Sequence, residues 1–190
     1  MKSTLVMVLL LSVVLTSCKK DEATFLMEQQ EEIKKQEQVF TKINNSWSFT
    51  AQPITVTSQR LTQDWPEWRT FLKELSQKPK STLGAFKQKA KTLSTQAATL
   101  NTTLPLTYNV PEVRSRIATI TTHINSLNLY LHLGIIPEGK VTTLIPAINQ
   151  ELKSVQLQMA EIDQINSIKI EDGEQDMIRM LDTTRAISTN

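Results

Sequence analysis

Three long segments of this 190-residue chain place apolar residues three or four positions apart, which is the spacing of one apolar stripe along an α-helix. The stripes consist of Leu83, Phe86, Ala90, Leu93, Ala97, Leu100 and Leu104; of Val113, Ile117, Ile120, Ile124, Leu127 and Leu131; and of Val141, Leu144, Ile148, Leu152, Val155, Met159, Ile162 and Ile165. A helix cannot bury such a stripe by itself, so each segment needs neighbours. Short connections at 105–110 and 134–140 require consecutive helices to run antiparallel. The spacing therefore predicts an all-α antiparallel bundle.

Two further helical segments are available to complete this bundle. Residues 64–78 begin with Asp64, which is followed by Pro66 and Glu67 in a capping-box pattern with proline in the first turn. Residues 21–46 form a polar amphipathic helix with a thin apolar line, and we expect its later part to dock. The expected architecture is an antiparallel bundle of four to five helices.

Residues 47–63 break the helical spacing, because apolar and polar residues alternate there with a period of two. Trp47, Phe49 and Ala51 alternate with polar neighbours, and Pro53 interrupts the run. The sequence offers no third strand to stabilise such a segment, so it has to lie against the helices. We expect an extended segment at about 47–63 that packs across the bundle.

The start of the chain has the features of an export signal. Lys2 precedes an apolar run over residues 5–15 that contains a single serine. This length matches the apolar region of a signal peptide, whereas a membrane-spanning helix needs roughly 20 residues. Directly after the run, Leu15-Thr16-Ser17-Cys18 resembles the lipobox of bacterial lipoproteins, and Cys18 is the only cysteine of the chain. The resemblance implies that Cys18 becomes the mature N-terminus and carries acyl chains such as palmitate, which anchor it to a membrane.

The four residues that follow the cysteine are Lys19-Lys20-Asp21-Glu22. They resemble the short signal, lysine followed by acidic residues, that directs lipoproteins of the Bacteroidota to the outer face of their outer membrane. The resemblance implies that Lys19, Lys20, Asp21 and Glu22 act as an export signal and that the protein faces the cell exterior. A location on the periplasmic face is the alternative.

These features divide the chain into four parts. Residues 1–17 are the expected signal peptide, and residues 18–30 are the lipidated N-terminus and a tether. The helical bundle domain is expected over 31–168. Residues 169–190 are a tail for which a short helix and disorder are both consistent with the sequence.

Residue types that carry common catalytic or metal chemistry are sparse. A single cysteine and two histidines leave no His/Cys metal cluster, and His123 and His132 lie nine positions apart, on opposite sides of one helix. The stripes contain no acidic residue of the kind that di-iron bundles use. The chain has neither a Gly-x-Ser-x-Gly elbow nor a glycine-rich phosphate loop. We therefore expect a non-enzymatic protein with no catalytic residue, no metal and no other cofactor.

All three tryptophans fall within a short stretch, at Trp47, Trp65 and Trp68. One interpretation is a contact surface for a partner protein, a glycan or a small apolar ligand, because tryptophan combines a large ring with a polar N–H. The other interpretation is that Trp65 and Trp68 lie on the core face of their helix while Trp47 holds the extended segment in place.

Charge is distributed unevenly along the chain, although the net charge is only +2. Residues 69–91 carry +6, and residues 151–182 carry −5. These stretches are either two surfaces for different partners or neighbouring helices that attract each other. The basic stretch lacks the interleaved aromatics that nucleic-acid binding requires, so we expect no nucleic-acid partner.

Together, the residues suggest a lipid-anchored helical bundle that acts by binding. We expect an accessory or scaffold subunit that contacts a larger protein assembly of the outer membrane or envelope. The alternative is a ligand-binding module for a glycan or a small apolar molecule that uses Trp47, Trp65 and Trp68. An adhesin or a protective coat protein is a third class, and the oligomeric state is left open by the sequence.

Overall fold

The computed structural model describes residues 22–168, 173 and 179–180 of the chain. Contacts divide it into two compact units, one ending at Asn45 and the other beginning at Ser46. Within the described residues there are six α-helices and no strand, so the all-α prediction is confirmed. The elements are α2 (Glu22–Ser46), α3 (Val56–Asp64), α4 (Pro66–Ser76), α5 (Leu83–Leu100), the short 3₁₀-helix η1 (Leu106–Tyr108), α6 (Pro111–His132) and α7 (Glu138–Ser167).

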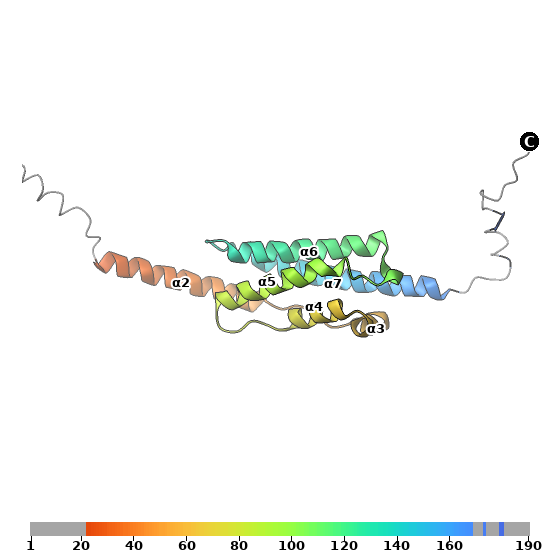
Figure 1. The fold of residues 1–190 in the computed structure, drawn as a ribbon. Coiled ribbons are helices and arrows are strands. Elements are labelled where there is room, and N and C mark those ends of the chain that lie inside the picture. The colour runs from red at the N-terminus through yellow and green to blue at the C-terminus, as the bar shows by residue number, and fades with distance from the viewer. Residues whose placement is uncertain (1–21, 169–172, 174–178, 181–190) are drawn as a thin grey trace, which may run out of the picture. The chain divides into compact units, whose positions relative to one another are not determined.

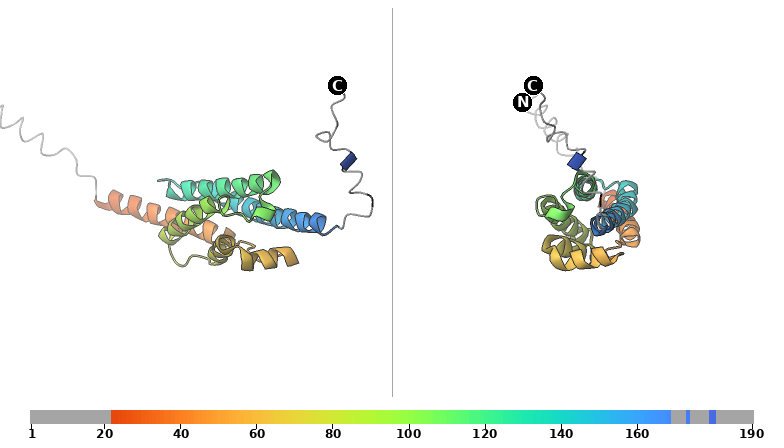
Figure 2. Two further views of the ribbon diagram at one scale, coloured as in Figure 1. Left: turned by 45° about the vertical axis from the view of Figure 1, so that its right-hand side comes forward. Right: turned by 90° about the vertical axis from the view of Figure 1, so that its right-hand side faces the viewer.

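Helices α5, α6 and α7 pack side by side, and the chain reverses its direction at each connection (Figure 1 and Figure 2). Contacts between side chains show the same geometry for α5 and α6. Ser94 donates a hydrogen bond to Asn125, and Thr121 donates one to the carbonyl of Ala97, so residue numbers rise on one helix as they fall on the other. Helices α5 and α6 are therefore antiparallel, as their short connection predicts.

The apolar stripes form the interior of this second unit. All six stripe residues of α6 are fully buried, as are Phe86, Ala90, Leu93 and Leu100 of α5. On α7 the buried apolar residues are Val141, Ile145, Ile148, Leu152, Val155 and Met159. The sequence prediction was wrong by one position near the start of α7, where Ile145 is buried and Leu144 is half-buried. The corrected row repeats every seven residues, which is the spacing that keeps one helix face in contact with its neighbours.

The last expected stripe residue of α7, Ile165, is exposed because the neighbouring helix does not reach it. The guanidinium of Arg116 donates hydrogen bonds to Ser154 and Gln158 of α7. In an antiparallel pair this register places Ile165 level with residues that precede Pro111, where α6 has not yet begun.

The segment expected to be extended over 47–63 is extended only to Thr55, and α3 follows it. We call residues 47–55 the strap. Thr55 begins α3 through a capping box, since its hydroxyl accepts a hydrogen bond from the amide of Ser58 (2.9 Å) and its own amide donates to the hydroxyl of Ser58 (2.8 Å). Serine replaces the usual glutamate of this motif, which is why the pattern was missed. The alternation is confirmed from Trp47 to Ala51, which are both buried while Ser48 and Thr50 are exposed. It does not continue to Ile54, which is exposed.

Asp64 ends α3 and does not cap the next helix, so the expected capping box at Asp64 and Glu67 is wrong. Pro66 is the first residue of α4, and the residue before a proline disfavours the helical conformation. Trp65 accordingly adopts an extended conformation (φ −119°, ψ 93°) between the two helices. The proline thus determines where α3 ends as well as where α4 begins.

The first unit is represented in the described residues by α2. Its residues 24–38 are all exposed, and burial begins at Val39. The exposed residues include four large apolar ones, which are Phe25, Leu26, Met27 and Ile33. This part of α2 is therefore a helix with an uncovered apolar line.

Candidate functional site

The proposed lipidation residue, Cys18, and the first three residues of the expected export signal, Lys19, Lys20 and Asp21, lie outside the described residues. Glu22, the last residue of that signal, is the first residue of α2. The expected signal peptide at 1–17 and most of the tail at 169–190 are likewise outside the described residues. These assignments stay predictions from the sequence.

The three tryptophans lie in two aromatic groups. Trp47 contacts Phe49 and Phe86 edge to face, with ring centroids 5.3 Å and 4.9 Å away. Trp65 stacks on Trp68 with centroids 5.4 Å apart and rings nearly parallel. The structure therefore brings Trp65 and Trp68 together, while Trp47 belongs to a different cluster.

All three indoles are part of the core. Their exposed fractions are 3% for Trp47, 1% for Trp65 and 0% for Trp68. The indole N–H of Trp65 donates a hydrogen bond to the hydroxyl of Thr103 (3.0 Å), as buried tryptophans commonly do. A ligand platform requires exposed ring faces, so these residues give no support to the glycan or apolar-ligand alternative.

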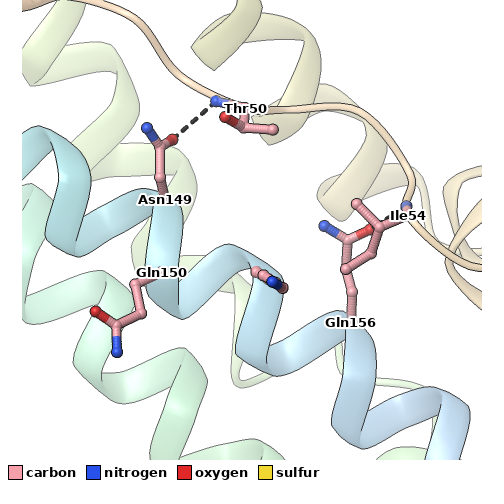
Figure 3. A pocket seen from close by; sticks show the side chains of 6 residues that line it. Thr50, Ile54, Asn149, Gln150 and Gln156 are labelled. Carbon is pink, nitrogen blue, oxygen red and sulfur yellow. Dashed lines mark hydrogen bonds between the residues drawn. The ribbon is translucent and has the colours of Figure 1, made fainter.

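A row of polar side chains that the sequence prediction missed holds the strap and α3 against α7. This polar row consists of Asn149, Gln156 and Asp163, which are seven residues apart and therefore share one face of α7. The side-chain amide of Asn149 accepts a hydrogen bond from the backbone N–H of Thr50 (2.8 Å) and donates one to the carbonyl of Ser48 (2.9 Å). Figure 3 shows the first of these bonds. Asn149 thus pairs with the strap much as a neighbouring β-strand would.

Gln156 continues the attachment one heptad further along α7 and is almost fully buried. Its side-chain oxygen accepts a hydrogen bond from the backbone N–H of Ile54 (3.0 Å), and its side-chain nitrogen donates to the carbonyl of Leu152 (3.2 Å). Figure 3 shows the Gln156 side chain directed at Ile54. Both polar atoms of a buried amide are satisfied, so Gln156 can lie in the interior without an unpaired group.

Asp163 ends the polar row in a cluster of hydrogen bonds with α3 and η1. It accepts hydrogen bonds from the hydroxyl groups of Thr57 (2.8 Å) and Tyr108 (2.6 Å) and forms an ion pair with Arg60. Burial works to raise the pKa of Asp163, but the hydrogen bonds from Tyr108 and Thr57 and the charge of Arg60 outweigh it and hold that pKa below its ordinary value. The carboxylate is therefore ionised over the physiological pH range.

Tyr108 is held in its protonated form within this cluster. Burial and the neighbouring Asp163 carboxylate raise the pKa of the Tyr108 hydroxyl. The protonated hydroxyl can donate to Asp163 while it accepts a hydrogen bond from Arg60 (3.0 Å). The cluster is a closed set of donors and acceptors, which suits a structural role.

A cavity of about 290 Å³ opens between the strap and α7 (Figure 3). Its lining residues are Thr50, Ile54, Asn149, Gln150, Lys153 and Gln156. The volume lies at the lower limit of ordinary small-molecule sites. The amides of Asn149 and Gln156 in it are already bonded to the strap.

The histidines and carboxylates of the described residues are groups that could form a metal site. Nδ1 of His132 donates a hydrogen bond to the carbonyl of Asn128 (2.8 Å), within its own helix. Among the described residues, no three His, Cys, Asp or Glu side chains gather where they could hold a metal ion.

The basic stretch at 69–91 and the acidic stretch at 151–182 each contribute to an ion pair, and neither of these two pairs links one stretch to the other. Lys89 of the basic stretch pairs with Glu74 of the same stretch, with 2.5 Å between Nζ and Oε1. Asp163 of the acidic stretch pairs with Arg60, which lies outside the basic one. These pairs hold α5 to α4 and α7 to α3.

The chain was compared with known families, characterised proteins and solved structures. None of them matches. In the part of the chain that the structure describes, no helix combines the length and the apolar character needed to cross a bilayer.

Proposed function

We propose that this protein is a lipid-anchored outer-membrane lipoprotein, displayed on the cell surface, that acts as a non-enzymatic accessory or scaffold subunit. The observation that carries the proposal is the position of the only cysteine. Cys18 follows the apolar run at 5–15 and the small residues Thr16 and Ser17, where a lipobox requires it. Several acyl chains on one residue anchor a protein almost permanently, since each buried methylene contributes about 0.8 kcal/mol.

The arrangement of the second unit supports binding in preference to catalysis. Its buried side chains are apolar stripes and indoles, and the hydrogen-bonding groups of Asn149, Gln156 and Asp163 are engaged in holding the strap and α3. Within the described residues of this unit, the outer surface of the helices is what a partner could contact. We take the mature domain to be an antiparallel bundle of four to five helices that offers this surface to a partner in the envelope.

Acylation is tested by replacing the cysteine in the full chain. Cys18→Ala is expected to abolish incorporation of a fatty-acid probe, whereas Ser17→Ala keeps a small residue before the cysteine and should retain it. Equal labelling of Cys18→Ala and the unchanged chain would show that the acyl group is elsewhere and would overturn the assignment.

Surface display is tested separately, by protease treatment of intact cells. Simultaneous replacement of Lys20, Asp21 and Glu22 by Ala should protect the protein from added protease without loss of the acyl label. If variant and unchanged chain are cleaved equally, these residues are not the export signal. If both are protected, the protein faces the periplasm.

The accessory role is tested by isolating the protein from detergent-solubilised membranes at native abundance. We expect a defined envelope protein to co-purify with it. Isolation of the acylated protein without any envelope partner would contradict the accessory role while leaving the anchor intact.

A further inference from the structure

The first part of α2 carries large apolar side chains that are exposed, among them Leu26 and Ile33. Residues 24–38 are exposed throughout, although isolated helices are marginal in water even when their sequences favour helix. Leu26, Ile33 and Phe40 lie seven residues apart and therefore on one face, with Leu26 and Ile33 exposed and Phe40 half-buried. One apolar residue per heptad is half of what a full coiled-coil seam contains. A second helix with a matching face would cover this line.

We propose that α2 pairs with α2 of a second copy of this chain, antiparallel and centred on Ile33. In this arrangement Ile33 meets Ile33 of the second copy. Leu26 lies level with Phe40 of the second copy, because both are seven residues from the centre. The apolar line is thus complementary to itself when one helix is reversed, as a two-fold contact requires.

The charges along α2 favour the antiparallel orientation. Residues 22–33 contain four glutamates and no basic residue, whereas residues 34–46 contain three lysines and one glutamate. An antiparallel pair places the acidic half of each helix beside the basic half of the other. A parallel pair would place four glutamates beside four glutamates. The distances within a helix pair are comparable to the screening length of about 8 Å at physiological salt, so this difference is felt.

The residues that border the apolar line can also pair across an antiparallel contact. Gln29 lies on the same side of the line as Gln36 of the second copy and close to its level. Gln30 stands in the same relation to Glu37 of the second copy. All four of these residues are exposed. An amide carries both donors and acceptors, so each pair can form hydrogen bonds across the line. The inference does not depend on acylation at Cys18.

Cysteine cross-linking of the full chain tests the pairing and its direction. Two copies with different affinity tags are co-expressed with their leader, one carrying Leu26→Cys and the other Phe40→Cys, and are then oxidised. We expect a disulfide between the two tagged copies, and we expect Ile33→Cys to cross-link with itself. Leu106→Cys, at an exposed residue of η1, controls for disulfides formed by random collision. The unsubstituted chain controls for disulfides formed by Cys18. Cross-linking of Leu26→Cys only with itself would overturn the antiparallel arrangement, and no cross-link above the controls would overturn the pairing.

Charge reversal provides a second test that does not disturb the apolar line. In a chain that carries Ile33→Cys, Lys34→Glu and Lys35→Glu make both halves of α2 acidic, so self-cross-linking should fall several-fold. Co-expression with an Ile33→Cys chain that carries Glu31→Lys and Glu32→Lys should restore cross-linking between the two copies. All four charged residues are exposed, so the folded state is unaffected. Equal cross-linking in every combination would show that charge does not align the helices.

Discussion

Two faces of α7 follow the same seven-residue spacing, but one contacts other helices and the other contacts the strap, α3 and η1. One face carries the apolar row, which we define as Val141, Ile145, Ile148, Leu152, Val155 and Met159, and it packs against neighbouring helices. The other carries the polar row of Asn149, Gln156 and Asp163, which binds the strap, α3 and η1. The spacing determines which residues share a face. The chemistry of the side chains determines whether that face receives another helix or the backbone of an extended segment.

The two faces also contribute to stability in different ways. Apolar side chains stabilise the fold by the surface they remove from water, at about 25 cal/mol per Å². Hydrogen bonds contribute only about 1 kcal/mol net, because the unfolded chain forms equivalent bonds with water. The strap nevertheless needs them, since its backbone groups have no strand partner and an unpaired buried group is costly. We therefore expect the apolar row to dominate stability and the polar row to determine where the strap lies.

The largest effect is expected in the apolar row. Leu152 is fully buried, so Leu152→Ala should lower the free energy of unfolding by about 2–5 kcal/mol through lost contacts and a residual cavity. Leu157 lies on the same helix with about half of its surface exposed, and Leu157→Ala should change stability by less than about 0.5 kcal/mol. Urea unfolding followed by the fluorescence of the buried tryptophans measures both. Equal effects of the two substitutions would contradict the bundle.

The apolar row could be predicted from the sequence, because two apolar residues in every heptad are consistent with few structures other than a packed helix. One error, Leu144 in place of Ile145, arose because neighbouring residues on a helix differ by only 100° and both are apolar. The other, Ile165, continues the spacing beyond the point where α6 can cover it. The burial of Trp68 was also within reach, since it lies on the same helix face as Phe71, Leu72 and Leu75. Trp65 is buried as well, but it lies in the extended link before α4 and not on that helix face.

The polar row could not be predicted in the same way. Polar residues seven apart are also what an ordinary solvent-exposed helix face contains, so Asn149, Gln156 and Asp163 carry no distinct signal of their own. Their meaning depends on the strap, which lies about 100 residues earlier in the sequence. The start of α3 was missed for a local reason, because its capping box pairs Thr55 with Ser58 and lacks the usual glutamate.

A smaller effect is expected at the buried member of the polar row. Gln156→Ala removes the acceptor for the amide of Ile54 and leaves a gap in the interior, so stability should fall by about 1–3 kcal/mol. Gln150→Ala, at an exposed position of the same helix, is the matched control and should be nearly neutral. The hydroxyl of Ser58 also accepts a hydrogen bond from the backbone amide of Ile54. If that bond alone satisfies the Ile54 amide, Gln156→Ala and Gln150→Ala will have the same effect.

The contribution of Asp163 to stability depends on pH, whereas that of the apolar row does not. Asp163→Asn removes the negative charge that accepts the hydrogen bonds of Thr57 and Tyr108, and we expect a loss of about 1–2 kcal/mol at neutral pH. The folded-state pKa of Asp163 is lowered, so its contribution is complete above the ordinary carboxyl pKa of 3.8 and is lost as the pH falls below that value. The stability difference between the two proteins should therefore shrink below about pH 4. Glu161→Gln, at an exposed carboxylate of α7, controls for a general effect of charge, and a difference that does not change with pH would contradict the role of the carboxylate.

The smallest effect is expected at Asn149, where the paired groups of the strap are exposed to water. Asn149→Ala should cost about 0.5–1.5 kcal/mol, because water can replace the lost partners of Ser48 and Thr50. Asn149→Asp keeps the acceptor for the Thr50 amide and loses the donor to the Ser48 carbonyl, so its stability should lie between those of the alanine variant and the unchanged chain. Because only this end of the strap is released, proteolysis near Ser48 should increase more than global unfolding does. A loss of stability as large as that of Leu152→Ala would mean that the strap is part of the cooperative core, and the distinction between the two faces of α7 would then fail.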